Sequence, residues 1–292
     1  MHPAVGFLYF AAVISLSMFL RNPMCIIISA GGAFAYLALT QERKKALKAL
    51  VLAVPVILTA TFINALFSHN GATIITYLPW GSPLTAEALF YGLCSGGLLI
   101  CVMMWFSNFN GVMTSDKITY LFGKAFPSLS LVFSMTLRFV PLFFHQAKKI
   151  SDAQKCIGRG VSEQGTKSFS ERAKSGLSIL SCLVTWSLEN SIETADSMKS
   201  RGYGLTGRTA FSIFKFTARD AAAGAAVILC TAYILFGCVR GAFYFRYYPS
   251  LKSADFTVYN ASVFAAYSFL CFLPAAIEFW EERKWKAIKS KI

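Results

Sequence analysis

The sequence predicts an all-α polytopic membrane protein, with about six transmembrane helices and long amphipathic cytoplasmic helices. The 292-residue chain is 55% hydrophobic and only 14% charged, and its mean hydropathy is +0.54. Soluble domains carry roughly 25% charged residues, so the composition excludes an ordinary soluble protein. Most apolar residues fall in runs of about the length that crosses a bilayer, and one long polar passage, residues 145–204, interrupts them.

Residues 1–125 are predicted to form an N-terminal transmembrane bundle of about four helices. The first two apolar runs are short for a span of roughly 20 residues, and Arg21-Asn22-Pro23 separates them, so a tight hairpin and a single interrupted helix both fit. Gly92 and Gly96 in the fourth run have the spacing that permits close helix contact. The four runs cover residues 4–20, 24–39, 49–67 and 88–106.

Residues 126–216 are predicted to form a cytoplasmic helical region. The run 126–144 is apolar enough to be a span, yet it contains Arg138 and Pro141 and continues without a break signal into a polar segment, so its crossing of the membrane stays open. A second helix is expected over about residues 170–201. At 1.5 Å per residue this helix is roughly 45 Å long.

One face of this second helix is apolar. Apolar residues recur at steps of three and four, which is the pattern of an amphipathic helix, while Glu189 and Glu193 fall on the other side as a solvated pair. The apolar stripe either faces a partner or packs inside the protein, and both interpretations stand. Its members are Leu177, Leu180, Val184, Leu188, Ile192, Ala195 and Met198.

Residues 217–292 are predicted to form a transmembrane hairpin, with apolar runs at 218–239 and 258–277, followed by a basic cytoplasmic tail. All but four of the 28 Lys and Arg residues lie in segments that this topology places in the cytoplasm. Such a positive-inside bias predicts a multi-pass cell-membrane protein with both termini cytoplasmic. The net charge of +14 therefore reflects topology and attraction to anionic lipid headgroups, and no nucleic-acid partner is expected.

No catalytic, cofactor-binding or metal-binding pattern stands out, so we expect neither an enzyme nor a bound cofactor or metal. Segment 160–168 nearly matches a phosphate-binding loop, but Thr166 separates its second Gly from Lys167, and a P-loop follows a buried strand. The eight Cys contain no CxxC pair, and three scattered His do not form a metal site. A membrane-embedded enzyme would need a polar cluster at the interface, which the sequence does not offer.

Two helix endings in the polar region share one pattern: Gly158-Arg159-Gly160 and Ser200-Arg201-Gly202. An Arg in the last turn complements the helix dipole and a following Gly suits a left-handed C-cap, which is enough to explain one such ending. Two of them, 42 residues apart and each closing an amphipathic helix, indicate plugs that enter two equivalent sockets. Inside a socket, the guanidinium group would donate to carboxylate or carbonyl oxygens. Paired sockets suggest two similar cytoplasmic subunits.

The chain resembles the transmembrane T component (EcfT/CbiQ-like family) of energy-coupling factor (ECF) transporters. The resemblance is carried by His2-Pro3, by the passage 137–160 and, most specifically, by Ala195-Asp196-Ser197-Met198-Lys199-Ser200-Arg201-Gly202-Tyr203. It implies two long coupling helices that cross, each ending in an Ala-Arg-Gly-type motif docked in one of two ABC-type ATPase subunits. Gly158 and Ser200 stand here in place of the family's Ala, and both are small.

The same resemblance implies that a separate membrane S component binds the substrate, a vitamin or metal ion, and that the ATPases supply the chemistry. This chain, in a prokaryotic cell membrane, would transmit their motion without catalysis. The apolar stripe over 177–198, together with the Phe-rich run 126–144, would carry the S component. Two alternatives stay open: a permease subunit of a conventional ABC transporter, and a self-contained membrane transporter.

Overall fold

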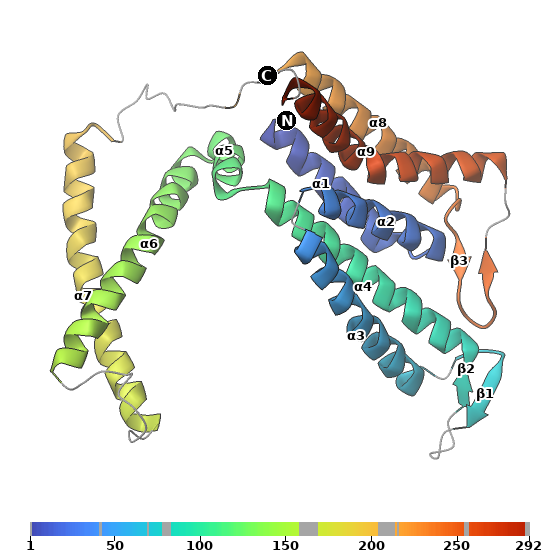
Figure 1. The fold of residues 1–292 in the computed structure, drawn as a ribbon, viewed down its shortest axis with the longest axis horizontal. Helices are drawn as coiled ribbons and strands as arrows, with labels where there is room; N and C mark the ends of the chain where they lie inside the picture. The colour runs from blue at the N-terminus through green and yellow to red at the C-terminus, as the bar shows by residue number, and fades with distance from the viewer. Residues whose placement is uncertain are drawn as a thin grey trace. The chain divides into compact units, whose positions relative to one another are not determined.

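The computed structural model describes residues 2–40, 43–68, 70–77, 83–157, 169–203, 214, 216–253 and 257–289. Within these residues the chain forms nine helices and two short antiparallel strand pairs (Figure 1), which confirms the predicted all-α class. The helices are α1 (Pro3–Phe19), α2 (Pro23–Thr40), α3 (Arg43–Phe67), α4 (Ala86–Val112), α5 (Ser115–Ala125), α6 (Pro127–Cys156), α7 (Phe169–Ser200), α8 (Ala218–Val239) and α9 (Val258–Lys289). Strand β1 (Ile74–Tyr77) pairs with β2 (Pro83–Thr85), and β3 (Phe245–Arg246) pairs with β4 (Lys252–Ser253).

The chain divides into two compact units. The first, named the apolar unit, comprises Met1–Ile118 and Phe214–Ile292, and the second, named the crossed-helix unit after α6 and α7, comprises Thr119–Ile213. The second unit is thus inserted in the sequence of the first, and the chain passes between the two units twice.

Five helical segments are long and apolar enough to cross a membrane, and all of them belong to the apolar unit. Helix α1 is also apolar but has 17 residues. With α1, these segments agree with the predicted number of about six, whereas α6 is not among the candidate spans of the described residues. The five segments are Pro23–Thr40, Leu50–Phe67, Ala86–Val112, Ala218–Val239 and Val258–Lys289.

The first two apolar runs form separate helices, each with its own cap. His2 is the N-cap of α1, and its ring Nδ1 accepts a hydrogen bond from the backbone N–H of Ala4. Pro23 begins α2, where its missing N–H costs nothing, and the side-chain oxygen of Asn22 accepts from the N–H of Met24 at 3.0 Å. The break therefore arises from capping residues, and the interrupted-helix alternative is wrong.

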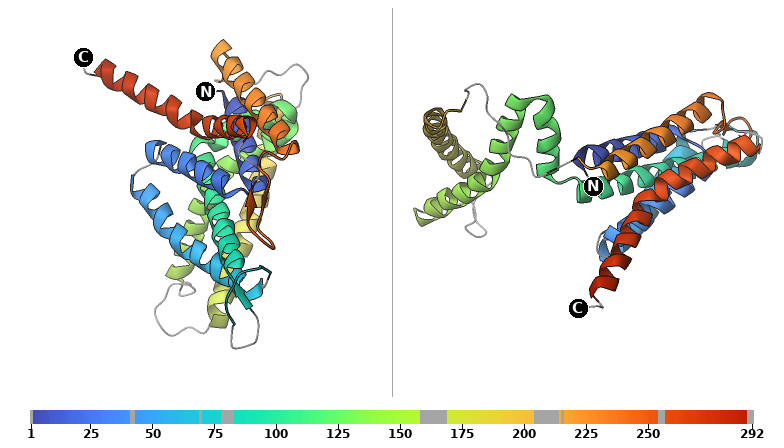
Figure 2. Two further views of the ribbon diagram at one scale, coloured as in Figure 1. Left: turned by 90° about the vertical axis from the view of Figure 1, so that its right-hand side faces the viewer. Right: turned by 90° about the horizontal axis from the view of Figure 1, so that it is seen from above.

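Helix α4 lies at the centre of the apolar unit and packs against α1, α2 and α3 (Figure 2). Trp105 of α4 is fully buried, and its indole N–H donates to the hydroxyl oxygen of Ser29 on α2 at 2.9 Å. A buried indole N–H needs such a partner because an unmade hydrogen bond costs about 1–3 kcal/mol. This contact fixes how α2 lies against α4.

Two glycines let α4 approach α3 closely, as their spacing predicts. A Cβ atom added at Gly92 would lie 2.8 Å from the Cα of Thr61, and one added at Gly96 would lie 2.9 Å from the Cα of Ile57. Cβ atoms essentially never lie within 3.0 Å of such atoms. Only glycine therefore fits at both positions without moving the helices apart.

Helix α9 bends along its length (Figure 1 and Figure 2), and Pro274 lies inside it. Proline has no N–H, so the carbonyl of Leu270, four residues earlier, loses its helical partner. The hydroxyl of Tyr9 on α1 donates to that carbonyl at 3.0 Å. A side chain near the start of the chain therefore satisfies the backbone group that the proline leaves open in the last helix.

Candidate functional site

Helices α6 and α7 cross near their middles (Figure 1). At the crossing, the rings of Phe143 and Trp186 meet edge to face with centroids 5.9 Å apart, and Phe139 stacks on Phe143 at 6.0 Å. Edge-to-face and offset-stacked rings are the favoured aromatic arrangements. The Phe-rich run and the second polar helix thus pack against each other through these rings.

The crossing uses a face of α7 other than the predicted stripe. Trp186 contacts Phe143 of α6, and Ile179 and Leu183, which lie at helical spacing before it, are half-buried like it. The sequence argument missed this packing face, although these residues also recur at steps of three and four. Helix α7 therefore has two apolar faces, and the predicted stripe is the more exposed of the two.

The predicted stripe is largely exposed. Its five larger aliphatic side chains have exposed fractions between 50% and 66%, Ala195 is exposed and Met198 is half-buried. Exposed apolar patches of this kind commonly mark contact with a protein or a membrane. The five residues are Leu177, Leu180, Val184, Leu188 and Ile192.

Helix α7 ends in the left-handed C-cap that its sequence predicts. Gly202 has a φ of +75°, a conformation that a side chain disfavours. The N–H of Tyr203 donates to the carbonyl of Met198 at 3.1 Å, and the N–H of Gly202 donates to that of Lys199 at 3.0 Å. This double closure is the Schellman motif, and it fixes the backbone of Arg201.

The side chains at this end differ in exposure and in their hydrogen bonds. Arg201 is exposed, while the hydroxyl of Ser200 folds back onto its own helix and donates to the carbonyls of Ser197 at 2.9 Å and Asp196 at 3.1 Å. Ser200 therefore adds no bulk beside the Arg. A guanidinium group held on a capped helix end presents a planar set of donors that suits carboxylates.

The other predicted ending lies outside the described residues. Gly158, Arg159 and Gly160 have no described placement, and helix α6 ends at Cys156 with Ile157 as its C-cap. One turn earlier, Lys155 donates to Asp152 Oδ1 at 2.9 Å. This hydrogen bond and the Lys155 charge, with a smaller effect of Lys148, hold the pKa of the Asp152 carboxyl below its usual value.

A third Arg-Gly pair, which the sequence argument did not consider, closes α8. Gly241 has a φ of +78°, and the N–H of Ala242 donates to the carbonyl of Gly237 at 3.0 Å. The guanidinium carbon of Arg240 lies 4.8 Å from the ring centroid of Phe236 and 5.9 Å from that of Tyr259. The backbone geometry is thus shared with α7, whereas this Arg packs on aromatic rings of its own unit.

Metal ligands do not gather in the described part of the chain: no group of three or more His, Cys, Asp or Glu side chains there is placed to hold an ion. Glu189 and Glu193 are exposed on α7. Segment 160–168, which nearly matches a phosphate-binding motif in sequence, lies outside the described residues. The candidate site among the described residues is therefore a set of exposed surfaces on α7: an apolar stripe and a capped Arg end.

Comparison with known proteins places these helices in a larger group. A family model described as "Cobalt transport protein" (CbiQ) matches residues 2–212. The chain is 34% identical over 116 residues to "Energy-coupling factor transporter transmembrane protein EcfT" of Lactobacillus helveticus, and 30% identical over 187 residues to EcfT 1 of Listeria monocytogenes. It is 26% identical over 197 residues to EcfT of Bacillus selenitireducens.

These matches cover part of each protein. They include 39%, 59% and 62% of this chain, in the same order, and 41%, 67% and 70% of the relatives. The chain thus matches less than half of the Lactobacillus relative and about two thirds of the other two.

Proposed function

The chain belongs to the CbiQ family of cobalt transport proteins, and on this premise we propose that it is the transmembrane coupling subunit of an ECF-type importer. Curated relatives bear the name of the energy-coupling factor transmembrane protein. The family match runs from residue 2 to residue 212, so it takes in α1 to α4 as well as both crossing helices. It therefore covers the elements on which the mechanism below depends.

The proposed topology is multi-pass, in a prokaryotic cell membrane, with both termini in the cytoplasm. The distribution of Lys and Arg supports it, because residues 41–48, the polar middle region and the C-terminal tail hold most of them. Functionally, residues 1–125 and 217–292 would anchor the subunit in the bilayer. Residues 126–216 would reach the cytoplasmic partners.

The proposed partners on the cytoplasmic side are two ABC-type ATPase subunits. The Ser200-Arg201-Gly202 end of α7 would enter one of them, and the Gly158-Arg159-Gly160 end the other. The observation that carries the proposal is the exposed Arg201 on a helix end locked by the Schellman motif. A locked helix end loses little conformational freedom on docking, so contact there stays tight and transmits force.

The proposed membrane partner is an S component that binds the substrate, a vitamin or a metal ion. It would rest on the exposed stripe from Leu177 to Met198. Because Phe143 and Trp186 hold α6 against α7 at their crossing, movement of the docked ends toward each other would turn the two helices about this contact as levers and shift the stripe. In this scheme the chain is non-catalytic, and ATP hydrolysis takes place on the partner subunits.

Co-purification and uptake test the scheme together. The double variant Arg159→Ala/Arg201→Ala is expected to insert in the membrane normally but to lose both ATPases and substrate uptake. Arg240→Ala is the matched control, since it removes an Arg with the same backbone geometry from the end of α8. Retention of both ATPases and wild-type uptake by the double variant would refute the docking role.

Subunit stoichiometry separates the alternatives. One copy of this chain per ATPase pair is expected for a coupling subunit with two docking ends. Two copies per pair would instead favour a permease subunit of a conventional ABC transporter. Transport by the purified chain without any ATPase would favour a self-contained transporter.

A further inference from the structure

One carboxylate serves the first turns of two helices that are far apart in the sequence. Oδ1 of Asp220 accepts a hydrogen bond from the backbone N–H of His2 at 2.9 Å, beside the start of α1. Its Oδ2 accepts from the N–H of Thr217 at 3.2 Å and from the Thr217 hydroxyl at 2.7 Å, at the start of α8. Helix N-termini carry partial positive charge and unpaired N–H groups. A single anion therefore stabilises both ends at once.

An aromatic contact reinforces this junction. The rings of His2 and Phe216 meet edge to face with centroids 5.2 Å apart. The same His2 ring accepts from the N–H of Ala4 through Nδ1 at 3.3 Å and so caps α1. His2 is thus bound on one side to its own helix and on the other to the segment that leads into α8.

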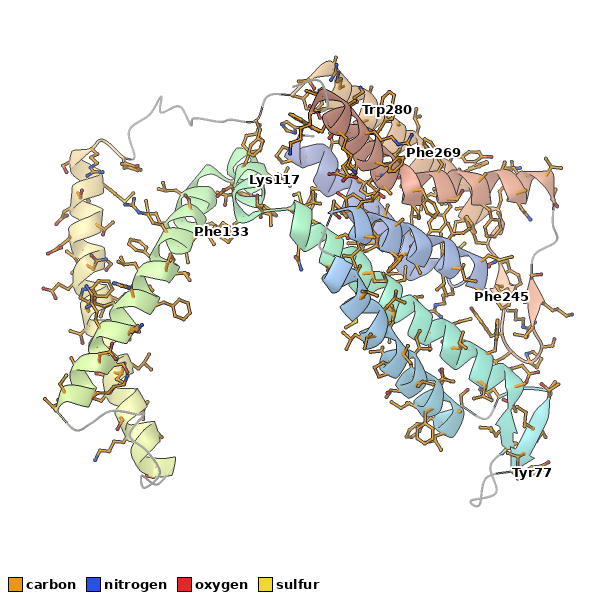
Figure 3. All side chains as sticks on the ribbon, viewed as in Figure 1. Tyr77, Lys117, Phe133, Phe245, Phe269 and Trp280 are labelled. Atoms are coloured by element: carbon orange, nitrogen blue, oxygen red, sulfur yellow. The ribbon has the colours of Figure 1, made fainter. Side chains whose placement is uncertain are left out.

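The junction lies where the chain enters and leaves the apolar unit. The crossed-helix unit begins after Ile118 and ends before Phe214, and Phe216 follows two residues later. On the other connection, Lys117 (labelled in Figure 3) lines a cavity of about 110 Å³ together with His2 and Pro274. Both connections therefore lie beside the first turn of α1, and the cavity borders that turn.

From α1, a second contact continues to the last helix. Tyr9, two turns after His2, donates to the carbonyl of Leu270 at the bend of α9. The order of contacts is Thr217 to Asp220, Asp220 to His2, and Tyr9 to Leu270. Together these hydrogen bonds link the start of α8 to α1 and α1 to the bend of α9.

We propose that Asp220 is a positioning residue that joins the starts of α1 and α8 into one joint, through which movement of the crossed-helix unit reaches the membrane helices. The inference rests on the proposed coupling function. In the joint, force on the segment before Phe216 is shared by α8 and α1 instead of bending α8 alone.

The variant Asp220→Asn separates the joint from a simple cap. An Asn side chain has one acceptor oxygen, and its NH₂ group cannot accept, so it cannot serve both helices. It also lacks the negative charge that favours both helix N-termini, so both are expected to weaken. Its size is almost unchanged. Thr217→Ala is the matched control, because it removes one hydroxyl from the α8 cap and leaves both backbone N–H bonds to Asp220 in place.

Hydrogen exchange on the full chain in nanodiscs tests whether the joint exists. In Asp220→Asn, amides of both α1 (residues 4–9) and α8 (residues 217–223) are expected to exchange roughly five- to tenfold faster, the size of a lost cap. In Thr217→Ala, faster exchange is expected in α8 alone. Faster exchange confined to α8 in Asp220→Asn would overturn the joint.

The ratio of substrate taken up to ATP hydrolysed tests whether the joint transmits movement. In the complex reconstituted with both ATPases and the S component, Asp220→Asn is expected to lower this ratio roughly three- to thirtyfold, with ATPase co-purification unchanged. An unchanged ratio would overturn transmission. If the wild-type chain fails to retain the ATPases, the proposed function and the transmission role both fall, while the exchange result still decides whether the joint exists.

Discussion

Helices α7 and α8 end in the same way and in different surroundings. Both close with Arg at the cap and Gly in the left-handed region, at φ of +75° and +78°. Both Arg side chains are exposed, but Arg240 at the end of α8 stacks on Phe236 and Tyr259. The residue before the Arg differs as well: Ser200 is small, whereas Val239 is a larger, branched apolar residue that is 88% exposed.

This comparison separates what a helix end requires of its Gly from what is particular to the end of α7. The Gly at both ends answers a backbone requirement, because a helix closed by the Schellman motif needs a residue at positive φ. Capping therefore explains the Gly at both of these ends. What distinguishes α7 is an Arg that no aromatic ring among the described residues of its unit covers, next to a small Ser.

Replacing each Arg by Ala is expected to give the largest contrast. Arg201→Ala removes the proposed charge-assisted hydrogen bonds, which are worth about 1.5–3 kcal/mol, so affinity for the ATPases should fall roughly ten- to hundredfold. Arg240→Ala should leave that affinity unchanged and lower stability by about 0.5–1 kcal/mol, because its contact with Phe236 is lost. Titration of nanodisc-embedded variants with purified ATPases measures the first effect, and thermal melting the second. Equal losses of affinity would remove the distinction between the ends.

Exchanging the residue before the Arg tests whether small size matters. Ser200→Val gives the α7 end the residue that α8 has, and overpacking of the proposed socket should weaken docking by about 1–3 kcal/mol. Val239→Ser is the reciprocal control and should not alter docking. The same titration reports both variants, and circular dichroism checks that helix content is retained. Wild-type affinity of Ser200→Val would contradict entry of this end into a groove.

Replacing Gly202 or Gly241 by Ala should lower the stability of that helix end by about 1–2 kcal/mol, because both positions have positive φ. At Gly241 an added Cβ meets nothing within 4 Å, so the cost there is conformational only and should appear in thermal stability. At Gly202 the same change misdirects Arg201, so docking should weaken about fivefold as well. Hydrogen exchange of the last turns and the ATPase titration measure the two effects. Weaker ATPase binding by Gly241→Ala would contradict the expectation that the α8 end has no part in docking.

Ser200→Ala is expected to have the smallest effect. The Ser200 hydroxyl bonds only to carbonyls of its own helix, and such back-bonding slightly destabilises helices. Ala restores the Ala-Arg-Gly form and should leave affinity unchanged, with stability higher by less than about 0.5 kcal/mol. Thermal melting and titration against wild type check this. A marked loss of docking would mean that the hydroxyl itself contacts the partner.

Several features of the fold could be predicted from particular residues of the sequence. The run lengths predicted the membrane helices, and the Gly92–Gly96 spacing predicted the close approach of α3 and α4. The position of Gly202 predicted the C-cap of α7. These features are local, because each depends on residues within one or two helical turns. The periodic stripe was also correctly located on α7, but the sequence could not say whether α6 covers it.

The sequence by itself determined that this chain is a helical membrane protein with a long polar insertion and a capped Arg end, since hydropathy, charge placement and glycine position act over short distances along the chain. Only the tertiary structure decided which face of α7 packs on α6, because 3.6-residue periodicity marks apolar faces without naming their partners. It also decided that Asp220 bonds to His2 and Tyr9 to the carbonyl of Leu270. Pairings across more than 200 residues arise from packing, which no local pattern records.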